Sequence, residues 1–178
     1  MTSAMISDIE SFLKWFESVN KRAMRDIGAL PEEAEAWLPP EADGEKGWSV
    51  GEIVKHIAES RLYFASAYCG NGWIFDAWDQ PFEGREAWLP TLQQSFEKLR
   101  ELTTGTPKEW LKRRVRLIGG EGHVSGWRVL MMMSEHDVHH RSQIDTYAGM
   151  NGWEVQHIFN RTAEWVLSQQ AAERQRSV

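Results

Sequence analysis

Apolar residues recur every three or four positions in four long stretches of the chain, which is the period of an amphipathic α-helix. The stretches cover Met5 to about Ile27, Val50 to Tyr68, Glu86 to Thr103, and Ser125 to Ala148. Helices of this length bury one apolar face most simply against one another. The pattern therefore predicts an all-α fold built as a four-helix bundle.

Local signals refine this outline. Ser49 and Glu52 form the S-x-x-E pattern of a capping box, which predicts the start of the second helix. Residues 113–118 alternate loosely, so we expect a short hairpin before the fourth helix. An apolar stripe predicts an additional C-terminal helix over Val155–Ser168. The chain has no internal repeat or linker, and we expect one domain over residues 1–178.

Composition excludes several classes of function. The formal net charge of −6 argues against a protein that binds nucleic acid or an anionic membrane surface through a basic excess. The sequence shows neither a signal-peptide pattern nor an apolar run of about 18 residues. With a single cysteine, Cys69, these features favour a cytoplasmic protein, and we interpret Cys69 as an incidental thiol. The one basic run, at positions 112–116, is expected to be a solvated face rather than an anion pocket.

Histidines supply the candidate chemistry. His136 and His140 are four residues apart, so on a helix they point the same way and could share one metal ion. Helix phase places both inside the apolar stripe of the fourth helix and His139 off its edge. Buried imidazoles need partners. A metal would satisfy both, and the alternative is a pair of structural histidines hydrogen-bonded to Gln143 or Tyr147.

A third ligand has to come from elsewhere, and His56 on the second helix is the best-placed candidate. Its phase lies on the flank of the apolar stripe, and periodicity alone favours an exposed position. Glu135 and Asp137 fall outside the stripe of the fourth helix, so we expect solvated charges there. For Arg141 we expect a structural salt bridge.

The sequence also resembles a known family. The string from Trp48 to Ile57, WSVGEIVKHI, looks like the second-helix motif of the DinB/YfiT-like superfamily, and HDVHHRSQI from His136 looks like its fourth-helix motif. Ser142 stands where that motif usually has glycine. The resemblance covers essentially the whole chain. It implies a four-helix bundle with an extra C-terminal helix and a metal site formed by three histidines, here His56, His136 and His140.

Three protein ligands and an open position are typical of a catalytic metal site. The resemblance implies a divalent ion, zinc or nickel, and either transfer of a low-molecular-weight thiol or hydrolysis by metal-bound water, with a small-molecule substrate and a homodimer. Glu52, Gln143 and Tyr147 are candidates to orient the ligands, although Glu52 has its capping role as an alternative. The competing hypotheses are a non-catalytic metal-binding stress-response protein and a metal-free bundle that acts through protein contacts.

Aromatic residues crowd the loop between the second and third helices: Trp73, Phe75, Trp78 and Phe82. They are interpreted as the mouth of a pocket, as a dimer contact, or as a loop folded back on the bundle. The sequence does not choose among these three.

Overall fold

The computed structural model describes residues 6–41, 47–74 and 79–176. Its long helices are α1 (Ile9–Gly28), α2 (Val50–Cys69), α3 (Trp88–Thr103) and α4 (Gly126–Met150), followed by α5 (Ala163–Arg176). Short 3₁₀ helices precede or link them: η1 (Glu32–Ala34), η2 (Arg85–Ala87) and η3 (Lys108–Lys112). The antiparallel strands β1 (Arg114–Arg116) and β2 (His123–Ser125) form the hairpin predicted before the fourth helix. The predicted all-α four-helix bundle is confirmed.

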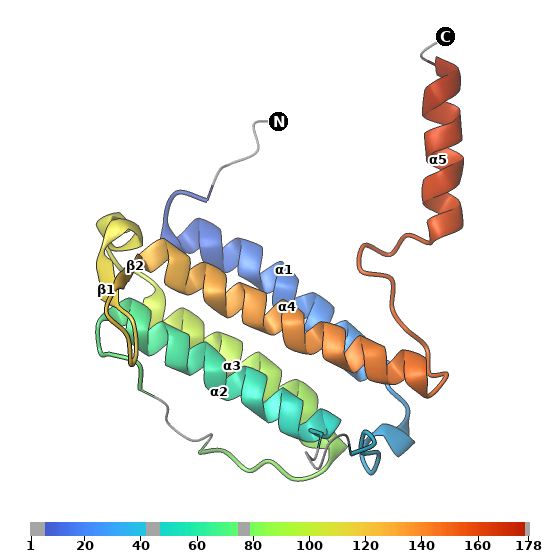
Figure 1. Cartoon of the computed structure of the whole chain (residues 1–178), viewed down its shortest axis with the longest axis horizontal. Coiled ribbons are helices and arrows are strands. Elements are labelled where there is room, and N and C mark those ends of the chain that lie inside the picture. Colours follow the sequence, from blue (N-terminus) through green and yellow to red (C-terminus); the bar gives the residue numbers. More distant parts are fainter. Residues whose placement is uncertain (1–5, 42–46, 75–78, 177–178) are drawn as a thin grey trace.

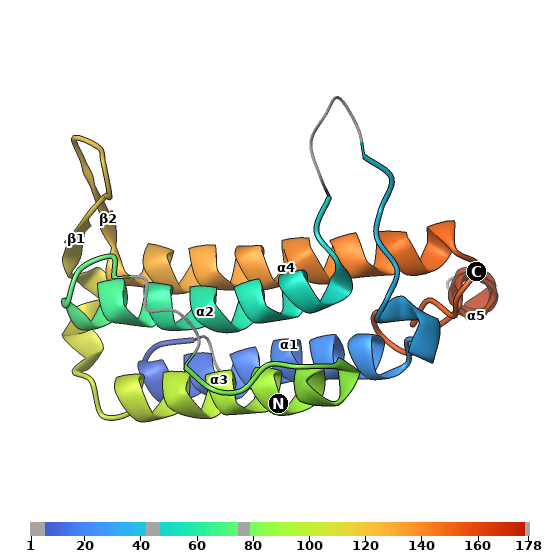
Figure 2. The same ribbon diagram turned by 90° about the horizontal axis from the view of Figure 1, so that it is seen from below.

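The four long helices lie in two layers, with α2 and α4 in one and α1 and α3 in the other (Figures 1 and 2). Helix α2 packs against α3 and α4, and α1 packs against the same two helices. Helices α2 and α3 begin at the same end of the bundle (Figure 1). Helix α4 runs in the opposite direction beside α2, which brings the two candidate motifs face to face.

Helix starts follow the local signals. Ser49 caps α2 through the predicted capping box: its hydroxyl accepts from Glu52 N–H at 3.2 Å, and Glu52 accepts from Ser49 N–H at 2.7 Å. Asp8 caps α1 in the same way with Ser11, so α1 begins at Ile9. The predicted start at Met5 lies outside the described residues. Side-chain acceptors at these positions satisfy N–H groups that have no partner within the helix.

The bundle has two apolar clusters with a polar level between them. One cluster lies near the hairpin and includes Phe12, Phe16, Phe64, Phe96 and Leu130. The other lies at the opposite end and includes Ile27, Val50, Ile53, Leu92 and Ile144. The intervening level holds buried polar side chains from all four helices: Asn20, Arg61, Ser95 and Asp137. Burial is unfavourable for a polar group without partners. The buried polar residues of this level are therefore candidates for a functional role or for fixing how the helices pack.

The C-terminal helix exists but does not lie where its pattern predicts. Residues 155–162 are not helical, and α5 spans Ala163–Arg176 instead of Val155–Ser168. Asn160 has a left-handed φ of 54°, and the Thr162 hydroxyl then accepts from Trp165 N–H at 3.2 Å, as an N-cap does. No residue of α5 is buried, so no tertiary partner holds the apolar stripe in the predicted register.

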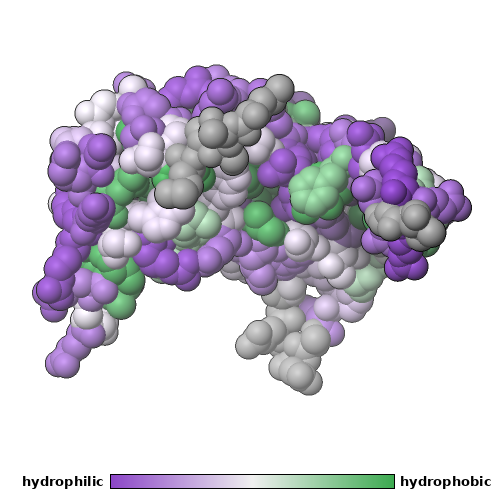
Figure 3. All heavy atoms as spheres, turned by 90° about the horizontal axis from the view of Figure 1, so that it is seen from above, coloured by the Kyte–Doolittle hydropathy of each residue, from purple (hydrophilic) through white to green (hydrophobic). Residues whose placement is uncertain are grey.

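Helix α5 projects away from the four-helix bundle (Figure 1). Seen from above, the surface is largely hydrophilic with separate hydrophobic areas, and the projecting hairpin is hydrophilic toward its tip (Figure 3). None of the helices in the described parts of the chain is both long and apolar enough to cross a membrane. The predicted homodimer and the predicted single domain stay predictions.

Candidate metal centre

Three histidines from α2 and α4 converge in the polar level of the bundle. His56 lies in the second turn of α2, and His136 and His140 lie one turn apart on α4. The Nε2 atoms of His56 and His136 are 2.9 Å apart. One potential ligand atom from each of the three side chains falls within 4.8 Å of the other two. The structure therefore brings together the three residues that the resemblance implies as ligands.

The spacing of these atoms suits a single ion. Zn–N bonds are about 2.0–2.1 Å long, so two nitrogens on one tetrahedral zinc lie about 3.3 Å apart. The rings surround one point, with centroids of His136 and His140 4.4 Å apart and each of them 4.8 Å from that of His56. Neutral imidazoles are the form that binds a metal. The donor set thus fits a divalent transition ion.

Burial keeps these imidazoles neutral. Desolvation, reinforced by the neighbouring histidines, lowers the pKa of His136 to about 3. Desolvation is also the main cause that lowers the pKa values of His56 and His140. His136 Nδ1 is buried and has no hydrogen-bond partner among the described residues. In the metal-free protein one neutral ring donates to the other across the 2.9 Å between the Nε2 atoms of His56 and His136, and the unpartnered His136 Nδ1 remains unfavourable.

Gln143 and Tyr147 hold the third imidazole in place. The His140 Nδ1–H donates to Gln143 Oε1 at 3.1 Å, because an amide oxygen can only accept. Gln143 Nε2 in turn donates to the Tyr147 hydroxyl at 2.9 Å. This chain fixes the His140 tautomer and leaves its Nε2 lone pair available, as bonds behind metal-binding histidines do. The structure thus places both predicted orienting residues behind His140.

Glu52 is placed differently. It closes the capping box at the start of α2 with Ser49. The proposal that Glu52 orients His56 stays a prediction. His56 itself is half-buried, so the exposed position favoured by periodicity alone is wrong, because α4 covers that flank of α2. His139 is exposed as predicted.

A buried ion pair lies beside the cluster. Arg61 is fully buried, and its guanidinium donates to Asp137 Oδ2 at 2.7 and 3.1 Å and to Leu92 O and Ser95 Oγ at 2.8 and 2.9 Å. These bonds tie α2, α3 and α4 together directly beside His136. The expectation that Asp137 is a solvated charge is wrong, because Arg61 provides a partner inside the core.

A sequence signal for this pair exists. Arg61 stands in the apolar stripe of α2, four residues from both Ile57 and Ala65, and an arginine at such a position implies a buried acidic partner. The other predicted charge pattern is confirmed: Arg141 pairs with Asp26 at 3.4 Å and lies 3.9 Å from Asp145.

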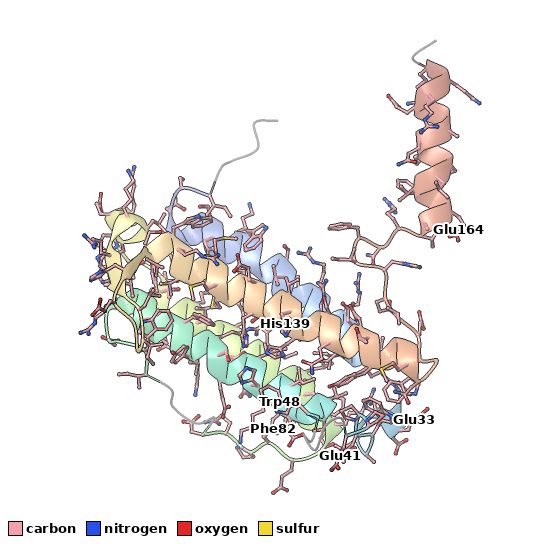
Figure 4. The ribbon with its side chains drawn as sticks, viewed as in Figure 1. Glu33, Glu41, Trp48, Phe82, His139 and Glu164 are labelled. Atoms are coloured by element: carbon pink, nitrogen blue, oxygen red, sulfur yellow. The ribbon has the colours of Figure 1, made fainter. Side chains whose placement is uncertain are left out.

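Aromatic side chains wall the centre. The Trp48 ring stacks on His140, with centroids 5.8 Å apart and planes 13° apart, and its edge faces His56 at 4.7 Å. Trp48 is 42% exposed, so it separates the cluster from solvent, and Figure 4 places it at the start of α2 near His139 on α4. From the sequence, Trp48 is only the first residue of the second-helix motif and has no predicted place at the centre. Of the aromatic loop, Trp73 packs on Tyr63 and Phe64, and Phe82 packs on the second apolar cluster. Phe75 and Trp78 lie outside the described residues.

The fold and this cluster define a four-helix-bundle protein with a candidate three-histidine metal centre. The family model of the DinB family matches residues 3–172. The chain belongs to the DinB family, which confirms the resemblance seen in its two motifs.

Solved structures agree with this assignment at the level of the fold. A DinB-like protein from Bacillus cereus ATCC 10987 is 18% identical, with a TM-score of 0.64 over 86% of this chain and 99% of its own. A DinB-like protein from Bacillus subtilis, YjoA, is 19% identical, with a TM-score of 0.65 over 83% and 96%. No protein of curated function matches the chain.

Proposed function

We propose that this protein binds one divalent transition metal ion, zinc or nickel, through His56, His136 and His140, and that it is an enzyme acting on small molecules. The observation that carries the proposal is the convergence of three imidazoles within 4.8 Å in a buried, charge-excluding setting. A divalent ion held by these three residues would supply Lewis acidity, which would lower the pKa of a water or thiol that it bound.

The chain's own residues prepare this chemistry. The hydrogen bond from His140 to Gln143 keeps the imidazole in one tautomer, and Tyr147 anchors the Gln143 amide. The Arg61–Asp137 pair holds the α2 and α4 backbones in the positions that bring the histidines together. Trp48 covers one side of the centre, which limits the access of water. A preorganised site of this kind favours reaction over mere binding.

Two reactions suit the site. In thiol transfer, the sulfur of a low-molecular-weight thiol loses its proton and forms a bond to an electrophilic carbon, and the leaving group departs with the bonding electrons. In hydrolysis, water adds its hydroxide to an acyl carbon, and the alcohol leaves with the proton. Both reactions need a nucleophile of lowered pKa. The protein's Cys69 is not that nucleophile, because burial raises the pKa of its thiol.

The test compares protein loaded with zinc or with nickel, metal-free protein and two variants. Thiol consumption is followed with an aryl halide and glutathione or cysteamine, and hydrolysis is followed with an activated ester. Metal-dependent turnover that is lost in His140→Ala and kept in His139→Ala is expected, because His139 is the exposed neighbour. A metal-loaded protein that turns over no substrate would favour the non-catalytic stress-response alternative.

A further inference from the structure

A hollow lies at the hairpin end of the bundle, between the C-terminal end of α2 and β1. Its volume is about 470 Å³, within the range of small-molecule sites. The wall is formed by Ala67, Gly70, Gly72, Trp73 and residues 113–117. Gly70 has a left-handed φ of 87°, and a Cβ there would come within 2.9 Å of the Arg113 guanidinium. Glycine therefore leaves the room that the arginine occupies.

Three arginines line this pocket, although the chain has a net charge of −6. Arg113 is held in place, because its guanidinium lies 4.3 Å from the centre of the Trp110 ring and donates to the Tyr68 carbonyl. Arg114 and Arg116 are exposed side chains of β1. None of the three takes part in an ion pair among the described residues. Arg114 Nη2 lies 3.3 Å from His123 Nδ1 and Arg113 donates to Tyr68 O, both of them uncharged partners. Guanidinium groups without an acidic partner around a hollow of this size are suited to an anion.

The strand edge adds further donors. In β1, Val115 pairs with Val124, and the flanking bonds Gly126 N–H to Arg113 O and Leu117 N–H to Gly122 O fix which residues face β2. In such a ladder the alternate residues, Arg114 and Arg116, direct their backbone groups away from the partner strand. The Trp73 indole N–H donates to the Arg116 carbonyl oxygen, which faces away from β2, at 2.5 Å. Outward N–H groups therefore stand beside the guanidinium groups.

A line of aromatic contacts connects this pocket to the three-histidine centre. The His136 ring lies 5.8 Å from the Phe64 ring, and Phe64 lies 5.9 Å from Trp73, which lines the pocket. The hairpin rises on the α2–α4 side of the bundle, the side on which the histidine-bearing helices lie (Figure 2). These two contacts put the Trp73 and His136 ring centres no more than about 12 Å apart, so a molecule about as long as an extended tetrapeptide spans from the Trp73 wall of the pocket to the histidines.

We propose that the pocket lined by Arg113, Arg114 and Arg116 binds the anionic end, carboxylate or phosphate, of the small molecule whose reactive end lies at the three-histidine centre. This inference rests on the proposed function and adds the charge, the length and the second attachment point of the ligand. Lys112, Arg114 and Arg116 are exposed, as expected from the sequence, and the proposal adds that this solvated face lines a pocket.

The test is an NMR titration of the ¹⁵N-labelled protein, as purified, with succinate and separately with inorganic phosphate at constant ionic strength. At least one anion is expected to shift the amides of Arg114 and Arg116 and the indole N–H of Trp73. Which anion binds distinguishes a carboxylate from a phosphate ligand. Arg116→Ala should weaken binding roughly tenfold, the effect of one charge-assisted hydrogen bond, whereas Arg176→Ala on α5 should not. Absence of shifts with both anions, or unchanged binding in Arg116→Ala, would overturn the proposal.

A second pair of titrations separates this inference from the proposed function, because anion binding in the first titration needs no metal. Zinc-loaded protein is titrated with glutathione, a thiol that carries carboxylates, and with cysteamine, which carries none. Glutathione should shift both the Arg114–Arg116 amides and those around His136, and cysteamine only the latter. If glutathione moved only the hairpin amides, the pocket would be an anion site independent of the histidines, and the proposed connection would be wrong.

Discussion

Two groups of buried polar side chains lie next to each other in the middle of the bundle, and they are satisfied in opposite ways. Every nitrogen of the Arg61 guanidinium donates to a protein oxygen on α3 or α4. In the histidine cluster, His56 Nε2 and His136 Nε2 hydrogen-bond to each other at 2.9 Å, and His136 Nδ1 is buried without a partner among the described residues. Asp137 Oδ1 is also buried without a partner among the described residues, so the fully satisfied group is the Arg61 guanidinium and not the whole ion pair. The guanidinium has all its partners within the fold, whereas the imidazoles have nitrogens to offer a ligand.

From this contrast, the largest loss of stability is expected when Arg61 is substituted. Arg61→Met should lower the free energy of unfolding by about 3–5 kcal/mol, because Asp137 is left buried and unpaired. The double variant with Asp137→Leu should recover most of that loss, since no uncompensated charge remains. Chemical denaturation measures both.

The matched control is Arg128→Met, which breaks the exposed pair with Glu135 on the same helix. Solvent screens that pair, so the free energy of unfolding should hardly change. Equal losses in Arg61→Met and Arg128→Met would contradict a structural role for the buried pair.

At the histidines the expected effect depends on metal. In metal-free protein, His136→Leu should change the free energy of unfolding by about 1 kcal/mol, because the imidazole it replaces has one hydrogen bond, to His56 Nε2, and a buried Nδ1 without a partner among the described residues. Added zinc should stabilise the wild type by about 4 kcal/mol at a thousandfold excess over its Kd. The variant should show no such gain in thermal unfolding with and without zinc. A zinc-dependent rise in the Tm of His136→Leu would indicate binding elsewhere.

A smaller effect on zinc binding is expected at Gln143, because Gln143 is not a candidate metal ligand itself but hydrogen-bonds to one, His140. Gln143→Leu removes the acceptor for His140 Nδ1–H and should weaken zinc binding about 10- to 100-fold without abolishing it. Competition with a chelator of known affinity gives the Kd. Gln93→Leu, which removes an exposed contact to Glu97 on α3, is the control and should leave the Kd unchanged.

The smallest effect is expected at Cys69. Burial raises the pKa of this thiol, so little thiolate is present at neutral pH. Cys69→Ser should leave metal content and turnover unchanged, and a thiol reagent should label the native protein slowly compared with the unfolded chain. Fast labelling, or loss of turnover in the variant, would show that the thiol belongs to the chemistry.

The sequence predicts the bundle well because periodicity reports burial against a partner. The starts of α2 and α4 fall within a residue or two of the predicted positions, where Ser49 and Ser125 cap them. The same pattern misplaces α5, whose apolar residues meet no partner surface. Helix phase also separates His140 from His139, since both lie on one helix and only their angle matters.

The periodicity of one helix does not predict which residues of a neighbouring helix cover it. Asp137 lies off the apolar stripe of α4, and only the placement of Arg61 on α2 makes it a buried residue. His56 is misjudged for the same reason, because the flank that its own helix exposes is covered by α4. The two-motif resemblance supplies this missing information, since it pairs His56 with His136 and His140 across the bundle.

The measurement that tests the central claim most directly is the metal content of purified, untagged protein by elemental mass spectrometry, before and after reconstitution with zinc and with nickel. We predict about one ion per chain in the wild type and in His139→Ala, and almost none in His56→Ala, because only the latter removes a ligand. Circular dichroism confirms that each variant is folded. A wild type that takes up no metal, or a His56→Ala variant that binds as much as the wild type, would contradict the three-histidine centre.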